Sequence, residues 1–544
     1  MTLVGGLRHA RSLLPHRSDY AGLSRSWRRD VLAGVTVGVV ALPLALAFGI
    51  SSGAGAAAGL ITAVVAGLVA AVFGGSHVQV SGPTGAMAVV LAPVVAQYGM
   101  GSLAMVTVLA GVLVLLAGVT GLGRAVTFIP WPVIEGFTLG IAAIIFLQQV
   151  PAALGQSASP GASPLVAAFR AVVGVDWSLA GPALLVTVLV AAVMVVLPRI
   201  HRAMPESLVA VIAATVLVVA LGLPVARIGE LPSALPAPVL PHADIGALRT
   251  LLGAALAIAA LAAIESLLSA RVAATMSPTG PYDPNRELVG QGLASVASGV
   301  FGGMPATGAI ARTAVNVRSG ARTRVSAIVH SLVLLAVVYL ASGPVAAIPL
   351  TALAAVLMVT SVRMVSVRTV GRILASTRSD AVTFVLTAVI TVGFDLIEAV
   401  QIGVVVAAVF ALRSVARRSS VTREELPGPP RPGDEKIAVL RLDGAMFFGA
   451  AERISNTITD AEHPDVKVVI IRMSQLGMLD ATGAHTLAQI AEELESRGVT
   501  VIIKGVRPEH RALLANVGVI DSLRHENHLI DSLDDAVEHA RSHV

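Results

Sequence analysis

The residues whose types could do chemistry lie in short interruptions of an otherwise apolar chain. One such stretch, 302–320, contains Pro305, Gly308 and Arg312 and ends at Gly320. We expect a helix that begins inside it and closes after about two to three turns, whereas a bilayer needs about 20 apolar residues. The N-terminus of such a half-helix presents unpaired N–H groups and a positive dipole. With the guanidinium of Arg312 one turn in, the stretch predicts an anion-binding site.

A second stretch, 77–93, has the same design: an alternating run, then Gly82-Pro83, then a short helix. The tripeptide Thr-Gly-Ala occurs in both, at 84–86 and 307–309. Two interrupted hydrophobic segments at matching places in two halves predict an inverted-repeat transporter with its site at the repeat interface. The alternative is a pair of Gly-Pro loops between ordinary helices. It is less favoured because such breaks at membrane depth are tolerated only where they line a cavity or are buried in protein.

Small residues at both breaks would let backbone amides approach a substrate: Thr84, Gly85, Gly308 and Ala309. Glu265 is an ionisable residue inside a long apolar segment, where a carboxylate is costly and commonly serves as a proton relay. Two structural alternatives stay open, a static pair with Arg312 or a side chain that reaches the cytosolic face near Arg271. Glu135 is a second acidic candidate, for which an interfacial role is equally plausible.

The composition places the chain in a membrane. Its 544 residues are 55% hydrophobic and 13% charged, whereas soluble domains are about 25% charged. The chain has no cysteine, which excludes thiol catalysis, disulfides and thiolate metal sites. We expect a transporter rather than an enzyme, without a cofactor, whose partners are a small anion, a proton and the lipid bilayer.

Fourteen apolar segments follow one another in two sets of seven, near 31–50, 54–74, 77–97, 102–121, 125–148, 179–198, 206–222, 247–270, 288–303, 304–320, 324–342, 345–361, 380–394 and 396–412. Arginines gather on alternate connections, which indicates an even number of crossings with both termini cytosolic. We expect a transporter domain at 31–415 in the inner membrane. The basic segment 1–30 reads as a cytosolic, juxtamembrane segment rather than a nucleic-acid-binding one.

The composition changes after a predicted linker at 416–435. Residues 436–544 predict a small soluble α/β domain with a parallel or mixed sheet. Its expected strands are 437–442, 466–471 and 499–503, and its expected helices 449–461, 482–497, 508–516 and 532–541. His525 and His528 have metal-like spacing, but without a third ligand they predict no metal site.

Several stretches resemble the sulfate permease (SulP) family, also called solute carrier family 26. They are DVLAGVTVGVVALPLALAFG at 30–49, ESLLS at 265–269, NRELVGQGL at 285–293 and GGMPATGAIARTAVNVR at 302–318. The tail resembles the STAS domain, named for sulfate transporters and anti-sigma-factor antagonists. The resemblance implies a 7+7 inverted repeat split into core and gate domains, with the anion bound between half-helices three and ten. It also implies a homodimer with cytosolic STAS domains.

Carried over residue by residue, the resemblance implies a substrate site formed by Phe48, Thr84, Gly85, Ala311 and Arg312, with Glu265 beside it. Some positions depart from the family pattern. Leu44 stands where many members have Gln, which removes a polar substrate contact. The sodium-coupled cyanobacterial bicarbonate branch tends to have Asp at 265 and Thr at 310, and this chain has Glu and Ile there.

The ESLLS pattern is more similar to a bacterial branch that moves C4-dicarboxylates with protons, so we expect a proton symporter of fumarate or succinate. Alternatives are a sulfate or bicarbonate transporter, an uncoupled channel or uniporter, and a sensor whose STAS domain is the output. In the tail, Asp480-Ala481-Thr482-Gly483 stands where anti-sigma antagonists have Asp-Ser-Ser-Gly. Thr482 is therefore a candidate regulatory phosphorylation site, with a helix N-cap as the simpler interpretation.

Overall fold

The structure is a computed structural model that describes residues 13–124, 130–156, 163–201, 204–241, 245–393, 396–448, 450–451, 454–455, 458 and 465–544. The chain divides into two compact units, Met1–Val404 and Val405–Val544. The first unit is built from apolar helices and the second is an α/β domain.

The first half of the helical unit follows the expected order of elements: η1 (Arg17–Tyr20), α2 (Leu23–Ser51), α3 (Gly55–Phe73), β1 (Ser81–Gly82), α4 (Gly85–Tyr98), α5 (Gly101–Val119), α6 (Trp131–Ala153), α7 (Pro164–Val173), α8 (Trp177–Ile200) and α9 (Glu206–Ala220). The second half contains α10 (Ile245–Met276), α11 (Pro284–Val300), β2 (Thr307–Gly308), α12 (Ile310–Arg318), α13 (Val325–Leu340), α14 (Ser342–Ala346), α15 (Leu350–Met364), α16 (Val367–Leu374) and α17 (Arg378–Gly393). The expected helical membrane fold with two broken segments is confirmed. Within the described residues, seven helices are long and apolar enough to cross a bilayer. The short helices α7, α14 and α16 were not predicted from the sequence.

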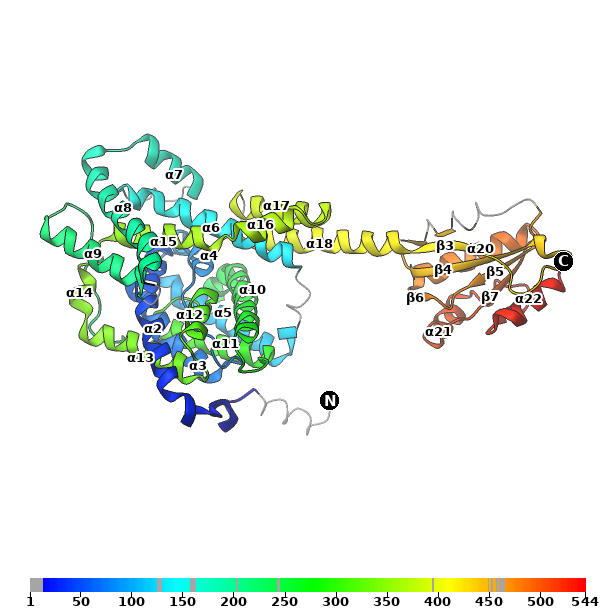
Figure 1. The fold of residues 1–544 in the computed structure, drawn as a ribbon, viewed down its shortest axis with the longest axis horizontal. Coiled ribbons are helices and arrows are strands. Elements are labelled where there is room, and N and C mark those ends of the chain that lie inside the picture. Colours follow the sequence, from blue (N-terminus) through cyan, green and yellow to red (C-terminus); the bar gives the residue numbers. More distant parts are fainter. Residues whose placement is uncertain are drawn as a thin grey trace. The chain divides into compact units, whose positions relative to one another are not determined.

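The helices of this unit pack as two groups. One contains α2, α3, α5, α10, α11, α12 and α13, and the other contains α6, α8, α9, α15 and α17. Helices from the two halves of the unit lie side by side, such as α2 and α13 (Figure 1). Small residues bring the backbones together, because a Cβ on Gly292 of α11 would lie 2.5 Å from the backbone nitrogen of Leu115 in α5.

The segment before the first span is not a free tail. Asp19, only 6% exposed, accepts hydrogen bonds of 2.9 and 2.5 Å from Arg286 at the start of α11. Arg324 lies 3.7 Å from the same carboxylate. Burial by itself raises the pKa of Asp19, but the bonds from Arg286 and the charge of Arg324 outweigh it and lower the pKa to about 2. The predicted segment 1–30 therefore contains a buried anchor, and α2 begins within it at Leu23.

The second unit contains a mixed sheet, as expected. Its strands are β3 (Ser420–Glu424), β4 (Ile437–Met446), β5 (Val468–Arg472), β6 (Leu476–Leu479), β7 (Thr500–Lys504) and β8 (Leu529–Ile530), in the order β3-β4-β5-β7-β8 with β6 beside β4. Only β3 runs antiparallel to its neighbour. Alternate strand residues face α20 (Ala481–Ser496) and α21 (Pro508–Val517) on one side and α22 (Leu533–Arg541) on the other. Figure 1 shows α20 and α22 on opposite faces. Strands β3, β6 and β8 were not predicted from the sequence, and the predicted helix at 449–461 lies largely outside the described residues.

The predicted linker, 416–435, is wrong in part, because it contains β3 and the end of α18 (Leu396–Arg418). β3 pairs along β4, and Glu424 accepts bonds from Arg441 at 2.6 Å and Arg472 at 2.8 Å. The polar sequence SVTRE suggested a linker, but it forms an edge strand whose partners come from distant positions. A truncation at 436 would therefore remove β4, the strand with which β3 pairs.

The buried anchor yields a first prediction. Asp19→Asn should lower the free energy of unfolding of the detergent-purified protein at pH 7 by about 3–5 kcal/mol, because it leaves two guanidinium groups without their carboxylate. The melting temperature should fall accordingly. Since the folded pKa lies below the ordinary 3.8, the contribution of Asp19 is complete above pH 3.8 and is lost as pH falls towards about 2. Glu230→Gln, which alters an exposed carboxylate, is the control. Equal melting temperatures of the two variants at pH 7 would contradict the anchor.

Candidate functional site

Two strands of two residues each join the two halves of the helical unit. Ser81 of β1 pairs with Gly308 of β2, and Gly82 pairs with Thr307, in antiparallel fashion. The pairing continues beyond the strands, because the backbone nitrogen of Ala309 donates to the carbonyl of Val80 at 2.9 Å. Each strand is followed at once by a short helix, α4 or α12. The breaks in two distant stretches are therefore one structural feature.

The N-termini of α4 and α12 keep donor groups available. The hydroxyl of Thr84 caps α4 by accepting from the nitrogen of Met87, whereas Ala309 offers α12 no side-chain cap. In the part of the chain that the structure describes, the backbone N–H groups of Gly85 and Ala311 donate no hydrogen bond. They belong to the first turns of their helices, where the positive end of the dipole lies. Both helix starts can therefore donate to an anion.

Arg312 is the cation of this site. It is 2% exposed, and its Nη2 donates to the carbonyl of Pro83 in the opposite break. Its Nη1 is buried without a hydrogen-bond partner. A Cβ at position 82 would lie 2.7 Å from Nη1, so Gly82 gives the guanidinium the space it occupies. A buried guanidinium with an unused N–H group is costly unless an acceptor completes its bonding, and an anion would also match its charge.

Glu265 of α10 lies at the crossing but does not pair with Arg312. Its Oε2 accepts from the hydroxyls of Thr84 and Thr307, both at 2.9 Å, and Thr307 also donates to Thr84 at 3.1 Å. The residue as a whole is half-buried, and no ion pair among the described residues joins its carboxylate to Arg312. This arrangement of Glu265 differs from both structural alternatives. One was a static pair with Arg312, and the other was a side chain that reaches the cytosolic face. Sequence reasoning overlooked Thr307, although the repeated Thr-Gly-Ala was a signal for it.

Phe48 and Gly85 lie close together. A Cβ on Gly85 would lie 3.2 Å from Cε1 of Phe48 in α2 and 2.3 Å from Cδ1 of Ile145 in α6. Phe48 is buried, whereas Ala311 is exposed one residue before Arg312. The start of α4 therefore contacts one helix from each of the two groups.

Gly308 and Ala309 do not have the role expected of them. A Cβ on Gly308 would lie 1.7 Å from Nε2 of Gln79, and its nitrogen donates to the hydroxyl of Ser266 at 3.1 Å. The nitrogen of Ala309 is bonded to Val80. These amides are used inside the protein, so Gly308→Val would disrupt packing rather than fill an anion site.

Thr482 belongs to the second unit. It is exposed in the first turn of α20, and the N-cap is Asp480, whose Oδ1 accepts from the nitrogen of Gly483 at 2.7 Å. A capping role thus belongs to Asp480, and phosphorylation of Thr482 stays a prediction.

Two family models match the chain, the sulfate permease family over residues 27–387 and the STAS domain over 429–536. The chain is 32% identical over 517 residues to "Putative sulfate transporter YvdB" of Bacillus subtilis, which covers 94% of this chain and 97% of that protein. It is also 32% identical over 542 residues to the bicarbonate transporter BicA of Synechocystis, covering 94% and 95%.

Solved structures agree with the fold. The murine Solute Carrier 26 family member A9 matches with a TM-score of 0.85 at 16% identity, over 98% of this chain and 95% of that one. The transmembrane domain of a cyanobacterial BicA matches with a TM-score of 0.63 at 33% identity, over 71% of this chain and 98% of that one.

The site yields a second prediction. Arg312→Ala should weaken anion binding by about 100-fold, since a desolvated, charge-assisted contact is lost. Arg312→Lys should recover part of it, because the fork geometry is absent. Arg318→Ala removes an exposed arginine from the same helix and should bind as the wild type does. The measurement is the affinity of each purified variant for a labelled anion. Wild-type affinity in Arg312→Ala would rule out this site.

Proposed function

We propose that this chain, which belongs to the sulfate permease family, is a secondary transporter that binds its anion between the N-termini of α4 and α12. One observation carries the proposal: the buried guanidinium of Arg312 has an unpartnered Nη1 and no carboxylate partner among the described residues. Free backbone N–H groups of two helix starts lie at the same crossing. This arrangement supplies positive charge and directed donors to a small oxyanion or carboxylate.

For the substrate we propose a C4-dicarboxylate such as fumarate or succinate, taken up with a proton. The support is the ESLLS pattern at 265–269 together with an acidic group beside the anion site. A second candidate is sulfate or bicarbonate, which the names of the two relatives favour. We place the protein in the inner membrane as a homodimer, with the termini and the STAS domain cytosolic.

Glu265 is the proposed proton-coupling group. Its carboxyl is held by two threonine hydroxyls rather than by a cation, so its charge is not compensated by an ion pair. An anion at Arg312 would add negative charge near it and favour its neutral form. Proton uptake and anion binding would then be linked, each favouring the other by the same free energy.

A third prediction tests this coupling in proteoliposomes with an imposed pH gradient. The solution on the side from which the anion is taken up is the more acidic one. Wild-type protein should accumulate one of labelled fumarate, succinate, bicarbonate or sulfate, and faster in acid. Glu265→Gln mimics the protonated state, so it should keep anion binding but lose concentrative uptake and most of the pH dependence. Glu135→Gln, which alters a carboxylate bonded to Trp131 at 3.1 Å, is the control and should still accumulate the anion.

Three results would revise the proposal. Accumulation by Glu265→Gln under the gradient would show that the proton takes another route. Uptake without any proton flux in the wild type would favour a channel or uniporter on the same fold. Lack of uptake of all four anions would leave a sensor as the better description, with the STAS domain as its output.

A further inference from the structure

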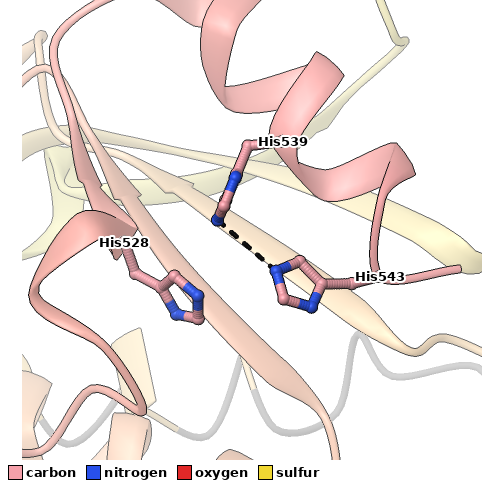
Figure 2. Close-up of side chains that lie close together, drawn as sticks. All are labelled: His528, His539 and His543. Carbon is pink, nitrogen blue, oxygen red and sulfur yellow. Dashed lines mark hydrogen bonds between the residues drawn. The ribbon is translucent and has the colours of Figure 1, made fainter.

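Three histidines meet at the C-terminal end of the second unit. His528 ends η4 (Glu526–His528) just before β8, His539 lies in the last turn of α22, and His543 follows that helix. One ring nitrogen from each can be chosen so that all three lie within 4.8 Å of one another. Figure 2 shows the three rings facing a common space between the helix and the sheet edge.

The spacing of the rings suits a metal ion. The Nε2 atoms of His539 and His543 are 3.4 Å apart. Two imidazoles bound to one tetrahedral zinc, with Zn–N bonds of about 2.0–2.1 Å, have their nitrogens roughly 3.3–3.4 Å apart. The ring of His528 lies edge-to-face with both, at centroid distances of 5.3 and 5.4 Å. A small movement of His528 would bring its nitrogen to bonding distance.

His528 provides an independent indication of a ligand. Its side chain is 1% exposed, yet neither ring nitrogen has a hydrogen-bond partner within the described residues. A buried imidazole without a partner is costly, and such groups in native proteins usually indicate a missing partner.

We propose that His528, His539 and His543 form a site for a borderline transition-metal ion, with Zn²⁺ as the expected occupant. Imidazole donors favour Zn²⁺, Cu²⁺ or Ni²⁺ over Mg²⁺ and Ca²⁺, which take oxygen ligands. The fourth position is left to water or to His525, whose ring centroid is 5.6 Å from that of His528. Glu495, a carboxylate whose charge acts on His528, is already paired with Arg524 at 3.1 Å.

The bound ion would join three elements. α22 covers one face of the sheet, and β8 is the edge strand beside β7. Residues of η4, α22 and the segment after it would share one metal, so the ion would fix the last helix to the sheet edge. The prediction of no metal site rested on His525 and His528 alone. His539 and His543 are brought next to His528 by the fold.

The test uses the full-length protein purified with an affinity tag that contains no histidine, after treatment with a chelator. Zinc affinity is measured by competition with a chromophoric chelator, and Co²⁺ is added separately to record visible absorption. The expected result is one Zn²⁺ per chain and the intense visible bands of tetrahedral Co²⁺. His539→Ala and His543→Ala should each weaken Zn²⁺ binding by about 10-fold or more.

The variants are chosen so that folding is preserved. His539 and His543 are partly or fully exposed, and removal of their rings does not open the core. His485→Ala, which removes an exposed histidine from α20, is the matched control and should bind Zn²⁺ as the wild type does. Wild-type protein that binds no stoichiometric Zn²⁺ at micromolar free metal would overturn the site. So would a His539→Ala/His543→Ala double variant, eluting as the folded wild type, with unchanged affinity.

Discussion

The transport unit depends on one positive charge that is kept away from water. Arg312 is 2% exposed, and a guanidinium at such a place destabilises the fold unless hydrogen-bond acceptors around it are arranged in advance. The opposite break supplies one acceptor, the carbonyl of Pro83, and Gly82 supplies the space. Neither break could provide this alone, which explains why two distant stretches are interrupted where they pair with each other.

The surrounding polar contacts hold the crossing rigid. Gln291 of α11 donates to the hydroxyl of Ser81 at 2.6 Å, and Thr313 of α12 accepts from the nitrogen of Val80 at 3.1 Å. Asn316, one turn further, donates to the carbonyl of Val78 at 2.8 Å. These bonds hold the segment that precedes α4 against α11 and α12. The unpaired amides at the two helix starts are then the part of the site that a ligand can use.

Local signals in the sequence predicted the breaks and the helices, since Pro, Gly and hydrophobic runs act within a few residues. Contacts between distant positions were not predictable in the same way. The sequence placed Glu265 near the site but could not show that Thr307 holds it, and it could not show that Gly308 faces Gln79. β3 was missed for a related reason, because a charged edge strand has no hydrophobic pattern and is specified by its partner.

The most direct measurement of the central claim is an experimental structure of the protein with its transported anion bound. The account predicts density for the anion between the first turns of α4 and α12, within hydrogen-bond distance of the guanidinium of Arg312 and of at least one free N–H group from each helix. Glu265 should remain beside it, bonded to Thr84 and Thr307. An anion found elsewhere in the helical unit, with Nη1 of Arg312 still unpartnered, would contradict the account.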